Sequence, residues 1–116
     1  MGGIIFFKTR ILSQLVEFYI NTLGMTIWLE QPGCTILKHG NMLIGFCQRE
    51  HEEIEGMITF VYDSREEVDR IYERIRDITI DAPHENSKYR IYQFFARDLE
   101  GRALEFQVFL YTTSPI

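Results

Sequence analysis

Near the end of the chain, "RDLEGRALEFQVF" contains a turn followed by an alternating strand, "ALEFQVF", in which Glu105 is the single acidic residue. Glu105 and Gln107 alternate with apolar neighbours, so a strand would place the two polar side chains on one face. A carboxylate on such a face can ligate a metal, accept hydrogen bonds from a ligand or transfer a proton. The structural alternative is a solvated or hydrogen-bonded carboxylate at the rim of a cavity.

The cysteines and histidines form no recognisable catalytic or metal-binding motif. Cys34 and Cys47 are too far apart for a CxxC motif and are predicted to be buried free thiols. The pattern places no histidine beside Cys47, so its thiol lacks a base. The segment "HEEIE" at 51–55 lacks the second histidine of HExxH, and the three histidines are predicted to lie on the surface.

The elements that position these residues occur in the same order twice, strand, helix and three strands. In the first half we expect a strand at 4–8, a helix at 12–23, a strand at 26–30 and a hairpin at 34–48. In the second half we expect a strand at 57–62, a helix capped by Ser64 and Glu67, a strand at 78–80, a loop at 81–88 and a hairpin at 89–109. The repeat predicts two βαβββ modules.

The chain of 116 residues is predicted to be a single domain, 1–116, with a first module at 1–48 and a second at 56–110. The polar segment between them reads as a connector. Superposing the two halves at the start of each helix places Ile11 on Asp63, and superposing the last strands places Gly45 on Glu105.

Two motifs resemble one known superfamily. "LVEFYINTLGM" resembles a helix motif of the vicinal oxygen chelate superfamily, and "FARDLEGRALEF" is similar to its C-terminal strand motif. That superfamily includes glyoxalase I, bleomycin-resistance and fosfomycin-resistance proteins and extradiol dioxygenases. The resemblance implies an α+β fold in which two βαβββ modules form a curved mixed β-sheet funnel.

The resemblance also implies four positions from which metal-dependent members ligate a divalent ion. In this sequence they fall on Ile4, Gly45, Gly56 and Glu105, and only Glu105 carries a ligating side chain. We therefore predict no metal and no cofactor. The alternative is a divalent Ni, Zn, Mn or Fe ion held by displaced ligands.

Strand alternation predicts which side chains share a cavity with Glu105. The predicted ligand-binding residues are Phe6, Lys8, Trp28, Cys47, Ile58, Phe60, Phe94, Glu105 and Gln107. Lys8 would carry an ammonium group that can pair with Glu105 or hold an anionic ligand. A filled core without a pocket, and a Lys8 side chain that reaches water, are the structural alternatives.

The resulting prediction is a protein that binds a small, partly aromatic or apolar molecule without a metal, resembling the bleomycin-resistance branch. The alternatives are a metal-dependent lyase, isomerase or dioxygenase with displaced ligands, a metal-independent enzyme that uses Glu105, and a closed-cavity module for protein association. Small two-module chains of this superfamily commonly pair, so a homodimer is predicted. The net charge of −5 without a clustered basic face argues against nucleic acid and anionic membranes as partners. The cytoplasm is the expected location, because no signal peptide is recognised.

Overall fold

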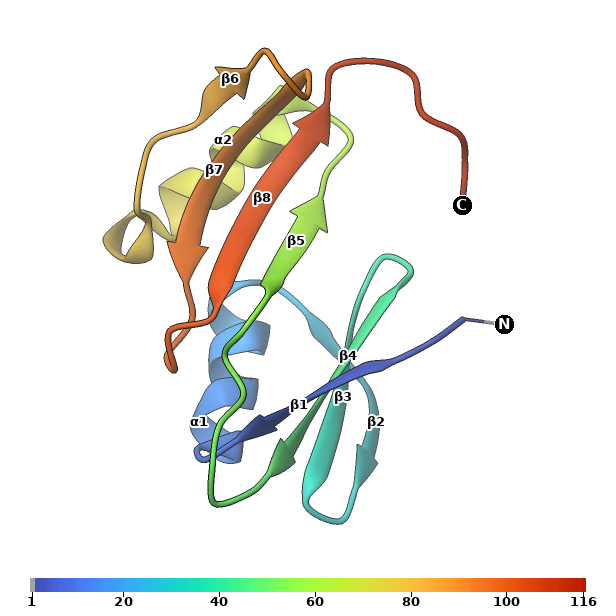
Figure 1. Cartoon of the computed structure of the whole chain (residues 1–116), viewed down its shortest axis with the longest axis vertical. Coiled ribbons are helices and arrows are strands. Elements are labelled where there is room, and N and C mark those ends of the chain that lie inside the picture. The colour runs from blue at the N-terminus through green and yellow to red at the C-terminus, as the bar shows by residue number, and fades with distance from the viewer. Residues whose placement is uncertain (1) are drawn as a thin grey trace. The chain divides into compact units, whose positions relative to one another are not determined.

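The apolar run near the N-terminus forms β1 (Ile5–Thr9), and the helical stripe that follows it forms α1 (Leu12–Glu17). The computed structural model describes residues 2–116. The chain divides into two units, the first running up to Glu55 together with Leu99–Gly101, and the second comprising Gly56–Asp98 and Arg102–Ile116. Each unit contains one four-stranded mixed sheet and one main helix (Figure 1).

In the first unit the sheet has the order β1-β4-β3-β2. Its other strands are β2 (Thr26–Gln31), β3 (Cys34–His39) and β4 (Met42–Gln48). β1 runs parallel to β4, and the remaining pairs are antiparallel. The predicted hairpin at 34–48 is confirmed, and its turn contains Gly40 at φ 57°, a conformation that glycine adopts readily.

The first helix packs one face on this sheet and changes its winding along the way. α1 continues directly into a π-helical turn, η1 (Phe18–Thr22), before Leu23 and Gly24 end the segment. Tyr19 is fully buried, and its ring centroid lies 4.9 Å from that of Phe46 on β4. A π turn contains one more residue than the equivalent α turn. Because of this extra residue, the helix of the first half and the helix of the second half align only with a shift of one residue.

In the second unit the sheet has the order β5-β8-β7-β6, and α2 packs on β7 and β8. The elements are β5 (Met57–Val61), α2 (Arg65–Arg74), the 3-10 turn η2 (Arg76–Ile78), β6 (His84–Asn86), β7 (Ile91–Arg97) and β8 (Ala103–Phe109). The capping box is confirmed, because the Glu67 amide donates to Ser64 Oγ at 3.2 Å. Figure 1 shows α2 behind β7 and β8 of its own sheet.

The third strand of the second module lies later in the sequence than predicted. Residues 78–80 form the end of η2 and a single bridge from Thr79 to Ala96, whereas β6 lies inside the predicted loop. The Asn86 side chain accounts for this placement. Its Nδ2 donates to Gln93 on β7 at 2.9 Å, and its Oδ1 accepts from the Lys88 amide at 3.1 Å, so it holds both the strand pair and the turn after it.

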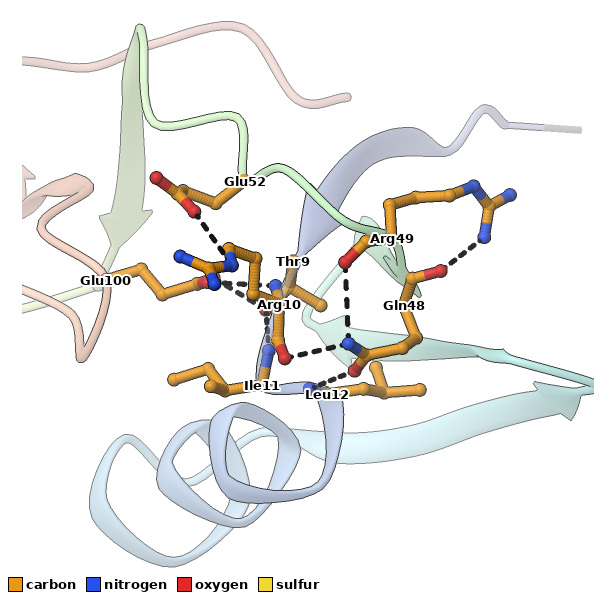
Figure 2. Close-up of polar contacts among 8 residues, drawn as sticks. All are labelled: Thr9, Arg10, Ile11, Leu12, Gln48, Arg49, Glu52 and Glu100. Carbon is orange, nitrogen blue, oxygen red and sulfur yellow. Dashed lines mark hydrogen bonds and ion pairs between the residues drawn. The ribbon is translucent and has the colours of Figure 1, made fainter.

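A polar cluster fixes the start of α1 in the first unit (Figure 2). The Glu100 carboxylate accepts from the Thr9 hydroxyl at 2.6 Å and from the Arg10 amide at 3.0 Å. The Gln48 side chain accepts from the Leu12 amide at 2.9 Å and donates to the Arg10 carbonyl at 2.7 Å. Because α1 has no side-chain cap of its own, Gln48 satisfies one of the amides that a helix start leaves without a partner.

Two tyrosines of the second unit have raised pKa values, and one of them links the sheet to α2. The Tyr92 hydroxyl on β7 donates to Asp69 on α2 at 2.6 Å, and this hydrogen bond, followed by desolvation, raises the pKa of Tyr92 to about 12. Burial raises the pKa of Tyr62 well above its ordinary value.

None of the helices among residues 2–116 is long and apolar enough to cross a membrane.

Candidate functional site

The face of each sheet that lies away from its helix, called here the open face, is defined by strand register. In the second sheet Thr59 pairs with Glu105, and Phe60 pairs with Phe106. The rings of Phe60 and Phe106 lie 5.0 Å apart, and Phe106 stacks in turn on Phe94 at 4.9 Å. These three rings are fully buried beneath α2, so Thr59 and Glu105 belong to the open face.

The predicted lining of the second module is therefore corrected for three residues. Ile58, Phe60 and Phe94 were expected beside Glu105, and the structure places them on the helix-facing side. Gln107 is on the predicted face, because it pairs with Gln93 across the open side. Glu105 and Gln107 are both buried, at 6% and 7% exposure.

Phe94 pairs with Phe106, so it lies on the face opposite Glu105. For Ile58 and Phe60, the π turn of the first helix explains the error. The helix ends match Leu23 with Ile75, in the same alignment that placed Ile11 on Asp63. The observed helix starts instead match Leu12 with Arg65, so the alignment shifts by one residue across η1. The helix-facing Phe7 of β1, which stacks on Phe46, therefore matches Phe60. A shift of one residue in a strand exchanges its two faces. The equivalence of Gly45 and Glu105 is confirmed, because Gly45 and Phe46 match Glu105 and Phe106 in register.

A chain of hydrogen bonds fixes the Glu105 carboxylate on the open face of the second sheet. Thr59 Oγ1 donates to Glu105 Oε1 at 2.8 Å, and Gln93 Nε2 donates to Glu105 Oε2. Asn86 donates to Gln93 Oε1, which fixes the amide orientation of Gln93. Within the second unit no ion pair joins Glu105 to a cationic side chain. Glu105 is thus a buried carboxylate held by two neutral donors.

Apolar side chains share this open face with the polar chain. Met57 and Val61 are about half exposed, at 51% and 47%. Phe95 and Phe109 are half-buried, and Phe95 lies directly opposite Glu105 in the strand register. The face therefore presents a polar centre surrounded by apolar and aromatic groups.

The open face of the first sheet carries the other predicted residues. Phe6 pairs with Gly45, and Lys8 pairs with Cys47, as parity predicted. The Phe6 ring covers Gly45 so closely that a Cβ there would lie 2.3 Å from the ring. Phe6 is 48% exposed. Lys8 belongs to the first unit and Glu105 to the second. Within the second unit, Thr59 and Gln93 donate hydrogen bonds to Glu105.

The cysteines are a correction. Cys34 and Cys47 were predicted to be free thiols, and the structure joins them by a disulfide between β3 and β4, with Cα atoms 4.1 Å apart. The two residues lie directly opposite each other in the hairpin. The two cysteines are 13 residues apart in sequence, too far for a CxxC motif, but the hairpin turn between them brings them together.

Trp28 lies on β2, an edge strand of the first sheet. Ile27 pairs with Leu37 and Leu29 pairs with Ile36, so Trp28 is the extra residue of a β-bulge. Its side chain is 50% exposed, and both neighbours in sequence are also exposed. Trp28 is therefore part of an exposed apolar strip and not of a buried lining.

The positions that ligate metal in metal-dependent members do not fit a metal here. Ile4, Gly45 and Gly56 offer no donor side chain, and Met57, which replaces Gly56 once the register is corrected, offers a thioether. Both oxygens of Glu105 already accept hydrogen bonds. Among residues 2–116, no three His, Cys, Asp or Glu side chains come together as a metal site.

Sequence reasoning missed Thr59, Gln93 and Asn86. Gln93 is the only amide in the apolar and aromatic stretch "IYQFFA". Gln93 and Gln107 are equally far from the turn between β7 and β8, which indicates that they pair. Asn86 carried no such signal, because it lies in a segment that reads as a loop.

No protein-family model and no curated protein sequence matches the chain. Solved structures do match over nearly its whole length. A glyoxalase/bleomycin resistance protein/dioxygenase from Nocardioides is 20% identical, with a TM-score of 0.75 over 100% of this chain and 87% of that one. A family enzyme of the same description from Burkholderia phytofirmans PsJN is 22% identical, with a TM-score of 0.76 over 90% and 95%.

A lactoylglutathione lyase from Agrobacterium tumefaciens is 20% identical, with a TM-score of 0.74 over 90% of each chain. Identities this low show likeness of fold and leave the chemistry to the site. The two βαβββ modules give this chain the fold of the glyoxalase/bleomycin-resistance/dioxygenase proteins, as its resemblance to the vicinal oxygen chelate superfamily predicted.

Proposed function

We propose that this chain binds a small molecule, without a metal, on the open face of the second sheet. The observation that carries the proposal is the buried Glu105 carboxylate, which is held by two neutral donors of its own sheet and lacks an ion-pair partner within its unit. Removing a carboxylate from water is costly unless hydrogen bonds replace its hydration. A ligand that donates to Glu105 would complete that replacement.

The geometry indicates what such a ligand carries. An ionised carboxylate has about four acceptor sites, so two hydrogen bonds leave room for further donors. The neighbouring Phe95, Val61 and Met57 favour apolar or aromatic groups. The ligand class is therefore a small molecule with an N–H or O–H donor on a partly apolar or aromatic body.

The first test is a thermal-shift screen of aromatic amines, phenols and hydroxylated heterocycles. A compound that binds the folded chain raises its melting temperature by mass action. Glu105→Gln keeps the side-chain shape but replaces a charged acceptor, so the hits should bind about 10- to 150-fold more weakly, the equivalent of about 1.5–3 kcal/mol.

The control is Glu66→Gln, the same chemical change on the exposed surface of α2. It should leave affinity unchanged. Hits whose affinity is equal in wild type and Glu105→Gln would show that the carboxylate is not the binding group. Turnover of a hit that is lost in Glu105→Gln would instead make the protein an enzyme with Glu105 as its proton-transfer group.

We also propose that the chain forms a homodimer through β2. This edge strand exposes Ile27, Trp28 and Leu29, at 45%, 50% and 44%. An exposed apolar edge strand is a site at which a second chain can pair. Light scattering after size exclusion should show that Trp28→Lys shifts the population toward monomer, whereas Ile80→Lys, a change at an exposed residue of the second unit, does not. A wild-type monomer at all concentrations would refute the dimer.

We also propose that the protein is located in the cytoplasm. The redox state of the Cys34–Cys47 pair tests this location, because disulfides are uncommon in reducing compartments such as the cytoplasm. Thiol labelling of the protein in intact cells distinguishes a reduced pair, expected for the cytoplasm, from a stable oxidised one.

A further inference from the structure

We propose that the Cys34–Cys47 disulfide is a thiol-exchange site, at which a low-molecular-weight anionic thiol attacks Cys34. The disulfide lies on the open face of the first sheet and contributes to the lining of a cavity of about 360 Å³. Lys8, Arg49 and Glu53 line the same cavity. This activity is independent of the ligand site in the second unit, because all of its residues belong to the first.

Position in the sheet selects the sulfur that is attacked. Cys34 is the first residue of β3, directly after the turn at Gly33, and it is half-buried. Cys47 lies on β4 between β1 and β3, and it is only 9% exposed. Exchange depends on access to the attacked sulfur and on the stability of the departing thiolate. Access favours attack on Cys34, which makes Cys47 the leaving group.

The charges around the cavity favour the same direction. Lys8 is the register partner of Cys47 across β1 and β4, so the two side chains leave the same face on adjacent strands. A neighbouring cation stabilises a thiolate. Glu53 accepts from the Lys8 backbone amide at 2.9 Å and contributes the one carboxylate among the charged residues of this lining, against two cations. The excess positive charge favours an anionic thiol.

The exchange balances without any further oxidant or reductant. The incoming thiolate forms a bond to Cys34 Sγ, the Sγ–Sγ bond breaks, and its electron pair leaves with Cys47 as a thiolate. One thiolate is consumed and one is formed. The β3–β4 ladder continues from Thr35–Phe46 to His39–Met42, so the hairpin keeps Cys47 close to Cys34 and the disulfide can re-form by the reverse step.

The experiment exposes the folded protein to 2-mercaptoethanesulfonate, which is anionic, or to cysteamine, which is cationic, at equal thiolate concentrations. Samples are quenched with acid, blocked with N-ethylmaleimide and mapped by peptide mass. We expect the mixed disulfide on Cys34 and the maleimide on Cys47, with the anionic thiol reacting at least about threefold faster. Lys8→Gln should slow the reaction and reduce that preference, whereas Lys88→Gln, in the second unit, should not.

Rapid re-closure could leave the mixed disulfide too short-lived to map. Acid quenching at millisecond times after rapid mixing then traps the mixed disulfide before re-closure and decides between the sulfurs. The proposal requires faster modification of Cys34 than of Cys47. A faster reaction at Cys47, equal rates for the two thiols, or a disulfide that opens only in denaturant would overturn it.

Discussion

Replacing Asp98 with alanine should lower the free energy of unfolding by about 3–5 kcal/mol, because it leaves a buried guanidinium without its carboxylate. Arg102 is only 2% exposed, and its Nη1 lies 3.2 Å from Asp98 Oδ2. Asp98 Oδ1 also accepts from the Arg102 amide at 3.0 Å, so the carboxylate holds both ends of the turn between β7 and β8. Urea unfolding followed by circular dichroism measures the loss.

Two further variants test the cause. The double variant Asp98→Leu with Arg102→Met removes both charges and should regain much of the lost stability, because apolar replacements of a buried pair are often neutral. Glu73→Ala breaks the exposed pair with Arg76 and should change stability by less than about 0.5 kcal/mol. A loss below about 1 kcal/mol in Asp98→Ala would mean that the pair is hydrated in solution.

Replacing Phe60 with alanine should also lower the free energy of unfolding by about 3–5 kcal/mol, since it removes a buried ring and leaves a cavity. Phe60 is fully buried and stacks on Phe106. Its neighbour Val61 is 47% exposed on the opposite face of β5, so Val61→Ala should have a small effect, within about 0.5–1 kcal/mol.

This contrast tests the strand register directly. If β5 had the register that the helix ends indicate, Phe60 would line the open face and its removal would affect ligands more than stability. In the observed register, Phe60→Ala should lower stability and leave ligand affinity nearly unchanged. Affinity is measured with the hits of the thermal-shift screen, at temperatures where the variant is folded. Equal losses of stability in Phe60→Ala and Val61→Ala would contradict the assignment of faces.

Local patterns in the sequence were sufficient for much of the fold. The stripe from Leu12 to Leu23 and the box formed by Ser64 and Glu67 predicted both helices, because these signals depend only on neighbours in sequence. The equivalence of Gly45 and Glu105 was also accessible, since the last strand of each half follows a clear turn.

The winding of the first helix was not accessible from local patterns, whereas the disulfide was overlooked. A π turn leaves no periodic signal that distinguishes it from an α turn, and one extra residue at 18–22 was enough to exchange the faces of β5. The pairing of Cys34 with Cys47 had a signal in the sequence, because both residues are equally far from the turn of the predicted hairpin.

Polar residues in turns were equally hard to assign from sequence. Asp98 and Arg102 flank a turn and resemble solvated surface charges, yet they form a buried pair. Asn86 was placed in a loop, although it fixes the partner of Glu105. In each case the missing information was a contact with another strand.

Isothermal titration can measure whether a ligand binds at Glu105 without a metal. The strongest hit is titrated into wild type and Glu105→Gln, each first treated with a chelator, and into chelated wild type resupplied with Ni, Zn, Mn or Fe(II). We expect one ligand per chain in chelated wild type, no gain in affinity on adding metal, and an affinity at least about tenfold weaker in Glu105→Gln. Binding that requires added metal, or equal affinity in the two proteins, would contradict it.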